Sequence, residues 1–481
     1  MRKFTLLPSL LLLGSLSLTT ACSTSSSGST GSNTAAARGG ASSPAPVSTV
    51  DPTKIKGLAI VNDSSNDRSC PWATSYPAVP GAEAMTAAMK KDVDNYLANY
   101  LGKGSSGQPT SCGGATDASQ VPELNISFAF LVASGDVVGV RLLTQDHTGT
   151  GDGLTTKTYW YDGAAHASRT APGLIADDSR ITFLTAVKKE LKQRQGVDPT
   201  MLDQLTSADV DDASFTSDGA LKLSFDRGTV GVPAGGRYTV AFSKATVAPW
   251  LSAFGKRAQR QTMSPSGTLG LGAVSTPAPA VPTETASSTD TTNCAKVKCI
   301  ALTFDDGPAV TYTGTLLKYL AQYNARVTFF TVGQNVAAHP ELVRAEAKAG
   351  HQVGNHSWSH PDLTRLTTAQ VKEQLERTSA AIKAATGNAP TLFRPPYGAV
   401  NAQVKSATTM SPVLWTVDTE DWKYRDAVKV AQTVIAKAAR NGVVLMHDIH
   451  PTSVAAVPEI LKTLTARGYH FVTVSHLRAT L

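Results

Sequence analysis

The stretch ALTFDDGP, residues 301–308, places two carboxylates side by side between an apolar run and a Gly-Pro turn. Asp305 and Asp306 carry like charges, so they are either two solvated turn residues or two groups with different tasks. A hydrolytic metal site would use both, because it needs one carboxylate as a ligand and another as a base for water. Neighbouring residues at a strand end point in different directions, so one carboxylate can face a metal while the other faces the water.

Two histidines four residues apart supply the other half of such a site. His356 and His360 lie in GNHSWSHP, where Gly354 and Pro361 favour a loop after a strand over a helix. By itself, a pair of histidines at this spacing is more often surface or core filling. With Asp306 as a third ligand, the pair forms a two-histidine, one-carboxylate site with open positions, which is typical of catalytic zinc. The same ligand set also accepts cobalt or manganese.

These residues follow short apolar strands that alternate with helical segments in residues 294–481. The clearest helix is predicted at 366–387, with a capping box between Thr367 and Gln370 and with Gly387 at its end. Repeated strand–helix units predict an α/β fold whose parallel sheet closes like a barrel and gathers functional side chains at its C-terminal strand ends. The predicted strands are 299–304, 326–332, 351–356, 391–395, 412–417, 442–447 and 470–474.

Five motifs of this block occur in the order that is typical of one enzyme family. They are TFDDG (303–307), HSWSH (356–360), RPPYG (394–398), DTEDW (418–422) and LMH (445–447). Over residues 296–477 the chain resembles the NodB-type polysaccharide deacetylases, carbohydrate esterase family four. The resemblance implies a distorted (β/α) barrel of about seven strands and the removal of acetyl groups from N-acetylated sugars.

The resemblance also implies roles for the residues around the metal. Asp305 would be the general base for the water that the metal activates, and Asp306, His356 and His360 would be the metal ligands. Arg394 would keep Asp305 ionised and oriented through a charge-assisted bond. Taken alone, Arg394 would be read as an ordinary salt bridge at a strand end.

Further roles follow from the later motifs. The backbone N–H of Tyr397 would stabilise the tetrahedral oxyanion. His447 would be the general acid for the leaving amine, and Asp421 would keep it protonated. Trp422 and Leu445 would wall the pocket for the acetyl methyl group. Taken alone, Asp421 could simply cap a loop, and it is the joint occurrence of the motifs that favours catalysis.

The N-terminus indicates export. A basic head and a short apolar run end at Cys22, which follows the small residue Ala21 as in bacterial lipoprotein signals. The match is imperfect because Thr19 stands where an aliphatic residue is usual, so a plain signal peptide is the alternative. We expect lipidation of Cys22, a disordered tether at 23–51, and a location on the extracellular face of the membrane or in the cell wall, with plain secretion as the alternative.

We expect the four further cysteines to form disulfides, because the exported protein lies outside the reducing cytoplasm. Three pairings are possible. Cys70–Cys112 and Cys294–Cys299 are favoured, because each pair stays on one side of a Ser-, Thr-, Pro- and Ala-rich linker predicted at 261–293.

The linker separates the catalytic block from an N-terminal block at 52–260, which we predict to be an α+β domain without a cluster of catalytic residues. This block weakly resembles the RsiV-like, DUF3298-type extracellular domains, which implies wall binding or lysozyme binding. Residues 296–481 carry 20 Lys and Arg against 13 Asp and Glu, whereas the remainder carries 24 of each. This excess suits an anionic cell wall, and no basic cluster interleaved with aromatics suggests nucleic acid.

The leading hypothesis is therefore an exported, membrane-tethered, metal-dependent deacetylase that acts on a glycan polymer, with N-acetylglucosamine of peptidoglycan as its substrate. A chitooligosaccharide deacetylase or an acetylxylan esterase is the alternative within the enzyme class, because the motifs do not separate amide from ester substrates. A hypothesis of another class is a wall-binding or lysozyme-sensing protein with a non-catalytic barrel.

Overall fold

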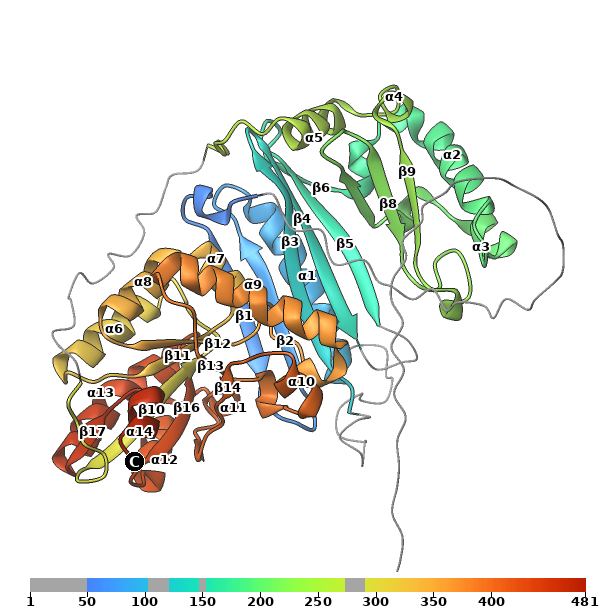
Figure 1. Cartoon of the computed structure of the whole chain (residues 1–481). Coiled ribbons are helices and arrows are strands. Elements are labelled where there is room, and N and C mark those ends of the chain that lie inside the picture. Colours follow the sequence, from blue (N-terminus) through green and yellow to red (C-terminus); the bar gives the residue numbers. More distant parts are fainter. Residues whose placement is uncertain (1–49, 103–120, 147–152, 273–289) are drawn as a thin grey trace, which may run out of the picture. The chain divides into compact units, whose positions relative to one another are not determined.

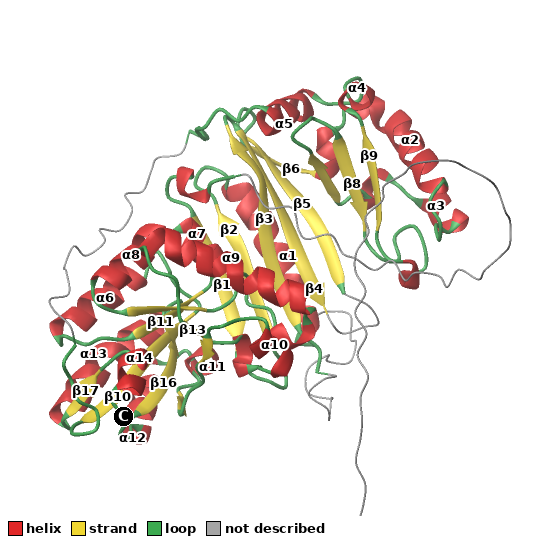
Figure 2. Cartoon of the chain, in the orientation of Figure 1, coloured by secondary structure: helices red, strands yellow, loops and turns green. Residues whose placement is uncertain are grey.

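The computed structural model describes residues 50–102, 121–146, 153–272 and 290–481 (Figure 1). Its C-terminal block is built on a parallel sheet, and helical segments follow most of its strands (Figure 2). The strands are β10 (Lys298–Asp305), β11 (Thr328–Thr331), β12 (Gln352–Asn355), β13 (Leu392–Phe393), β14 (Ser411–Pro412), β15 (Val417–Asp418), β16 (Gly442–His447) and β17 (Tyr469–Phe471).

The order of the strands explains how the sheet closes. It runs β14-β13-β12-β11-β10-β16-β15, with β17 pairing with β10 off this path, and every pair is parallel. The two ends of the path belong to one short segment of chain, 411–418. Within it Val413 N donates to Phe393 O at 2.9 Å, and Thr416 N donates to Val443 O at 2.8 Å. One segment therefore joins both edges, and the predicted distorted barrel of about seven strands is confirmed.

The same segment corrects one strand of the prediction. Residues 412–417 were expected to form a single strand, but the structure divides the segment into β14 and β15 with four residues of irregular chain between them. A barrel of few strands must turn sharply somewhere to close, and this segment turns between its two neighbours β13 and β16.

Helices pack around the sheet and bury its apolar side chains. Ile300, Leu302 and Phe304 of β10 are fully buried and share a core with Leu316 and Ile460 from two of these helices. The helices are α6 (Thr313–Gln322), α7 (Gly333–Ala338), α8 (Pro340–Lys348), α9 (Thr368–Thr386), α10 (Ala402–Ser406), α11 (Asp421–Tyr424), α12 (Ala427–Lys437), α13 (Pro451–Ala466) and α14 (Val474–Ala479).

Helix α9 begins and ends as predicted. The Thr367 side chain accepts from Gln370 N, and the Gln370 side chain accepts from Thr367 N at 2.9 Å, which completes the capping box. At the other end Gly387 adopts the left-handed conformation with φ of 84°, which a residue without a Cβ reaches at no steric cost.

The N-terminal block combines a six-stranded sheet of order β1-β2-β3-β4-β5-β6, a three-stranded sheet of order β7-β8-β9, and helices. The sheets share a core through Trp160 of the larger one and Phe215 and Leu223 of the smaller. The strands are β1 (Ala59–Ser65), β2 (Trp72–Ala78), β3 (Leu124–Ser134), β4 (Val137–Asp146), β5 (Leu154–Asp162), β6 (Ala167–Thr170), β7 (Asp212–Phe215), β8 (Leu221–Phe225) and β9 (Tyr238–Phe242), and the helices are α1 (Glu83–Tyr100), α2 (Arg180–Lys192), α3 (Pro199–Gln204), α4 (Lys244–Val247) and α5 (Ala253–Met263).

The structure moves the end of this block beyond residue 260. Helix α5 continues to Met263, and Gly270 N donates to Gly135 O at 2.8 Å. Leu271 is buried in the core around α1. Residues 261–272 therefore belong to the folded N-terminal block, and the predicted linker begins too early.

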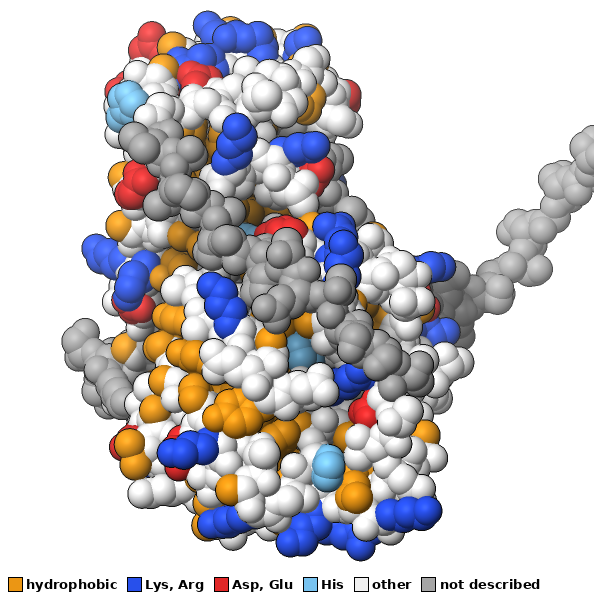
Figure 3. Space-filling model, turned by 90° about the vertical axis from the view of Figure 1, so that its left-hand side faces the viewer, with side chains coloured by type: hydrophobic (Ala, Val, Ile, Leu, Met, Phe, Trp, Pro, Cys, Tyr) orange, Lys and Arg blue, Asp and Glu red, His pale blue; other side chains and the backbone are white. Residues whose placement is uncertain are grey.

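Several expectations about export concern parts of the chain that the structure describes only in part. The predicted disulfide between Cys294 and Cys299 is present. Cys22 and Cys112 lie outside the described residues, so lipidation and the Cys70–Cys112 pairing stay predictions. Among the described helices, none is both long and apolar enough to cross a membrane. On the face drawn in Figure 3, Lys and Arg side chains are spread among neutral ones.

The capping box of α9 makes a first prediction. Thr367→Ala removes the side-chain acceptor for Gln370 N and should lower the free energy of unfolding of the catalytic block by about 1 kcal/mol. Thr368→Ala is the matched control, because it lies one residue further along, is exposed, and replaces Thr with a better helix former. Calorimetry of both variants checks this, and an equal melting temperature for both would show that the cap contributes nothing.

Candidate active site and metal-binding residues

The predicted site residues meet at the C-terminal ends of neighbouring strands. Asp305 is the last residue of β10, and it is paired in register with His447, the last residue of β16. His356 follows the end of β12, and Arg394 follows the end of β13. Parallel strands end at one edge of a sheet, so residues from four separate motifs lie together there.

Three of these residues form a cluster with the geometry of a metal site. The nearest nitrogens of His356 and His360 each lie 3.4 Å from Asp306 Oδ1, and one ligand atom from each residue lies within 4.8 Å of the others. All three side chains are buried. The structure thus brings together the three ligands that the sequence predicted.

Two of these residues have an unusual backbone conformation that directs their side chains into the cluster. Asp306 and His360 have φ of 72° and 59°, in the left-handed region that residues with a Cβ rarely adopt. Such strained residues persist only where surrounding contacts hold them. Asn335 Nδ2 donates to Asp306 O at 2.7 Å, and His356 Nδ1 lies 2.6 Å from Arg394 O. The carbonyl of Arg394 can only accept, so Nδ1 of His356 donates to it, and Nε2 faces the cluster with its lone pair.

The electrostatics of the cluster fit a bound cation. Asp306 Oδ1 and both ring nitrogens of His360 are buried without a hydrogen-bond partner among the described residues. Burial lowers the pKa of His360 to about 4, so its imidazole is neutral at pH 7, as a ligand must be. Burial would raise the pKa of Asp306, but the neighbouring histidines hold it well below the ordinary value. A carboxylate oxygen without a partner and a neutral imidazole without a partner, as Asp306 and His360 present here, fit a divalent metal.

Asp305 faces a different partner from its neighbour. Arg394 Nη1 donates to Asp305 Oδ1 at 2.7 Å and to Thr303 Oγ1 at 2.7 Å. The guanidinium is fully buried, and its central carbon lies 4.3 Å from the centre of the Phe330 ring. The second oxygen, Oδ2, lies 3.7 Å from His356 Nε2 and so borders the cluster without being its nearest carboxylate. Arg394 thus holds one oxygen of Asp305 and leaves the other directed at the cluster.

His447 is paired with Asp421. Its Nδ1 lies 2.8 Å from Asp421 Oδ1, and Asp421 Oδ2 accepts from His447 N at 2.8 Å and from Ser453 Oγ at 2.6 Å. Burial would lower the pKa of His447, but the charge of Asp421 beside it raises the pKa to about 9. The imidazole is therefore protonated at neutral pH and can give up a proton from Nε2.

The remaining predicted residues lie close by. The Tyr397 ring packs edge-on against His360 with centroids 4.8 Å apart, and φ of Tyr397 is 58°. Leu445 is fully buried in β16, two residues before His447, and Trp422 follows Asp421 in α11. Their roles as the walls of an acetyl pocket stay a prediction.

Sequence reasoning missed several residues of the site. Asp448, given no role, is buried and accepts from Thr313 Oγ1, and burial raises its pKa to about 7. A Cβ at Gly307 would collide with the Asp448 carboxylate, so only glycine fits there. Ser64 and Asn66 of the N-terminal block contact Asp306 and His447. Neutral residues hundreds of positions away carry no signal that could have predicted this.

Comparisons with known proteins give the family. The model of the family described as "Polysaccharide deacetylase" matches residues 292–411. A peptidoglycan-N-acetylglucosamine deacetylase of Bacillus cereus is 40 % identical over 187 residues, which are 36 % of this chain and 68 % of that protein. The chain belongs to the polysaccharide deacetylase family.

Two further relatives have a higher sequence identity to this chain, but the match covers a smaller share of their length. The peptidoglycan-N-acetylglucosamine deacetylase PgdA of Listeria monocytogenes is 48 % identical over 180 residues, 37 % of this chain and 39 % of that protein. The peptidoglycan-N-acetylmuramic acid deacetylase PdaC of Bacillus subtilis is 45 % identical over 180 residues, 37 % of this chain and 38 % of that protein. The match to these two therefore spans about two fifths of their length.

The ligand cluster makes a second prediction. His356→Ala removes one of three ligands and should lower zinc affinity at least about tenfold, since even groups behind the ligands contribute tenfold or more. His470→Ala, an exposed histidine on β17, is the matched control and should bind zinc like the parent. Zinc content per chain after dialysis, by mass spectrometry, checks this. Equal zinc in both variants would exclude the cluster as the metal site.

Proposed function

We propose that the chain is a metal-dependent deacetylase that hydrolyses the N-acetyl groups of peptidoglycan, with N-acetylglucosamine as the favoured sugar. One observation carries the proposal. The predicted ligand cluster lies beside Asp305, which is paired with arginine, and the end of the neighbouring strand carries His447, which a second aspartate keeps protonated. The matching relatives named for peptidoglycan deacetylation support the substrate class.

The residues of the site divide the reaction among them. Asp306, His356 and His360 would hold a divalent metal, with zinc as the best fit to the ligand set and cobalt or manganese as alternatives. When bound, this metal supplies Lewis-acid chemistry for the attack of water on the acetyl carbonyl. Asp305 Oδ2 takes a proton from the attacking water, while Arg394 holds the other oxygen.

Collapse of the tetrahedral intermediate needs an acid. His447 Nε2 donates its proton to the departing nitrogen, so that the sugar leaves as an amine rather than as an amide anion. Asp421 stabilises the imidazolium before this step and fixes the ring through Nδ1. The backbone N–H of Tyr397 donates to the oxyanion that forms from the acetyl oxygen.

The setting of the enzyme is part of the proposal. A lipid on Cys22 and the tether at 23–51 would hold the catalytic block at the outer face of the membrane, within reach of the wall. The N-terminal block would bind the wall or lysozyme, as its resemblance implies.

Acetate release separates the candidate substrates. Zinc-loaded protein should release acetate from isolated peptidoglycan, and more slowly from chitin oligomers or acetylxylan. Preference for chitin oligomers or acetylxylan would favour the alternative enzymes. No acetate from any of the three, with zinc confirmed bound, would leave a non-catalytic wall-binding protein.

The base makes a third prediction. Asp305→Asn keeps the shape of the side chain but cannot take a proton, so turnover on peptidoglycan should fall about 10²- to 10⁴-fold with zinc content nearly unchanged. Asp203→Asn, at an exposed position in α3, should leave both values as they are. Near-normal turnover of the Asp305→Asn protein would contradict the role of Asp305.

The acid makes a fourth prediction, in the pH profile. The acid form of His447 is present below its pKa of about 9, so kcat/KM should fall as the pH rises through that value. Asp421→Asn removes the charge that raises this pKa, so the alkaline limb should move to lower pH. The profile of Asp203→Asn should keep the original limb. An alkaline limb that does not move in the Asp421→Asn profile would exclude His447 as the acid.

A further inference from the structure

The reacting groups of the proposed site are almost out of reach of solvent. Asp305 and His447 are each 1 % exposed, and the metal ligands Asp306, His356 and His360 are 3 %, 2 % and 5 % exposed. A glycan polymer must bring an acetyl group to within hydrogen-bond distance of these atoms. Other parts of the chain therefore cover these groups in this structure.

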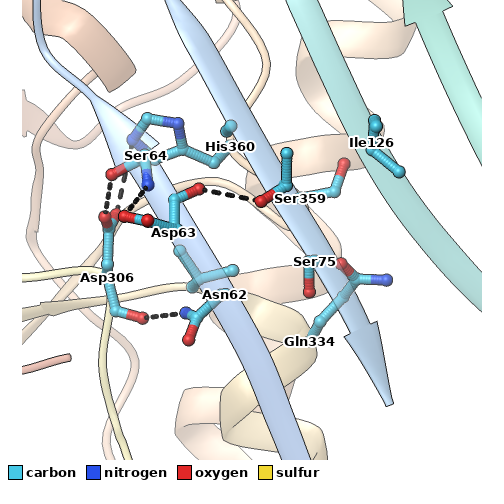
Figure 4. Close-up of a pocket in the computed structure, with 12 residues that line it drawn as sticks. Asn62, Asp63, Ser64, Ser75, Ile126, Asp306, Gln334, Ser359 and His360 are labelled. Carbon is cyan, nitrogen blue, oxygen red and sulfur yellow. Dashed lines mark hydrogen bonds and ion pairs between the residues drawn. The ribbon is translucent and has the colours of Figure 1, made fainter. Parts of the chain in front are cut away.

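The covering segment is residues 59–66, which consist of β1 and Asn66 directly after it, and we call it the cover strand. It belongs to the N-terminal block, and both blocks lie in one compact unit, Pro46–Leu481. Ser64 Oγ donates to Asp306 Oδ2 at 2.6 Å, and Asn62 Nδ2 donates to the Asp306 carbonyl at 3.3 Å (Figure 4). The cover strand thus holds both the side chain and the backbone of one predicted metal ligand.

The end of the cover strand contacts the proposed acid. Asn66 Nδ2 lies 2.9 Å from His447 Nε2, the nitrogen that the Asp421 pairing leaves free. A carboxamide offers a donor on one side and an acceptor on the other, so it can bond this nitrogen with or without a proton on it. Its planar C(=O)N unit is also the chemical unit of an acetamido group. Asn66 therefore occupies the place next to His447 where the scissile amide of a substrate would lie.

Polar contacts hold the cover strand and its sheet against the catalytic block. Asn125 Nδ2 of β3 donates to the carbonyls of Ser359 and His360 at 2.9 and 3.1 Å, and Asp63 forms an ion pair with Arg425. Gln334 Nε2 donates to Phe128 O at 2.8 Å. A small pocket between the blocks is lined by Asn62, Ser64, Asp306, Gln334 and His360 (Figure 4). Hydrogen bonds of this kind exchange readily with water, so the contact suits reversible opening.

We propose that the cover strand is a built-in inhibitor, in which Asn66 and Ser64 take the place of the acetamido group, and that catalysis requires its withdrawal from the site. The inference rests on the proposed function. A residue that merely lined the substrate cleft would leave the reacting atoms open to the glycan. Ser64 and Asn66 instead bond to Asp306 and His447 themselves. The fraction of molecules with the strand withdrawn then multiplies the apparent activity.

Removal of these two contacts should open the site. We expect Ser64→Ala and Asn66→Ala each to raise kcat/KM for chitin oligomers about five- to tenfold in the full zinc-loaded chain, as the loss of one net hydrogen bond from the closed state predicts. Asn95→Ala, at an exposed position in α1, is the matched control and should have the parent rate. A second readout is the rate at which a coloured chelator strips zinc from each protein, which should rise by a similar factor in the two variants only.

The outcomes separate this inference from the proposed function. Parent-like rates of acetate release and zinc loss in both variants would overturn it, and so would a lower kcat/KM, which would make the two residues part of the substrate cleft. A rise in kcat/KM without faster zinc loss, or the reverse, also contradicts it, because withdrawal of the strand exposes Asp306 and His447 together. If neither parent nor variants release acetate from any glycan, the proposed function fails, while the zinc-loss rates still decide whether the strand covers the metal ligands.

Discussion

Two carboxylates in adjacent positions repel one another, and a buried pair of this kind is stable only if each has its own source of positive charge or hydrogen bonds. Asp305 ends β10 in extended conformation, whereas Asp306 turns into the left-handed region, so the two side chains diverge. Arg394 neutralises the first, and two histidines with the site for a cation surround the second. This separation of the two charges is the constraint on which the rest of the site depends.

The barrel brings the arginine and the histidines close to Asp305 and Asp306. His356 and Arg394 follow β12 and β13, and His447 ends β16, so a sheet of parallel strands places all three at the same edge as the end of β10. Closure through 411–418 fixes β13 and β16 relative to one another, since a single segment bonds to both. Movement of Arg394 away from Asp305 would leave an unpaired charge in a fully buried place, so the ion pair also secures the geometry.

Much of the barrel and of the site could be predicted from the sequence, because the motifs that indicate them are short, local and chemically distinctive. Apolar runs that end in Asp, His or Arg predicted both the strands and the site at their ends, and the capping box predicted where α9 begins. The split at 411–418 could not be predicted, since an apolar run of six residues does not record which neighbours it pairs with. Leu269 and Leu271 fall in the predicted linker because the stretch 261–293 is rich in Ser, Thr, Pro and Ala, yet contacts with Gly135 and with the core around α1 hold them in the folded block.

The position of the cover strand over the site could not be predicted from the sequence either. Ser64 and Asn66 gain a role only through contacts with residues far along the chain. In the proposed site Asp306, not Asp305, shares a metal with the two histidines. Anomalous diffraction at the zinc edge from crystals of the zinc-loaded chain tests it directly. We expect one strong peak within bonding distance of Asp306, His356 and His360, with Asp305 bonded to Arg394 instead. A peak bonded to Asp305, or none at this cluster in zinc-loaded crystals, would contradict it.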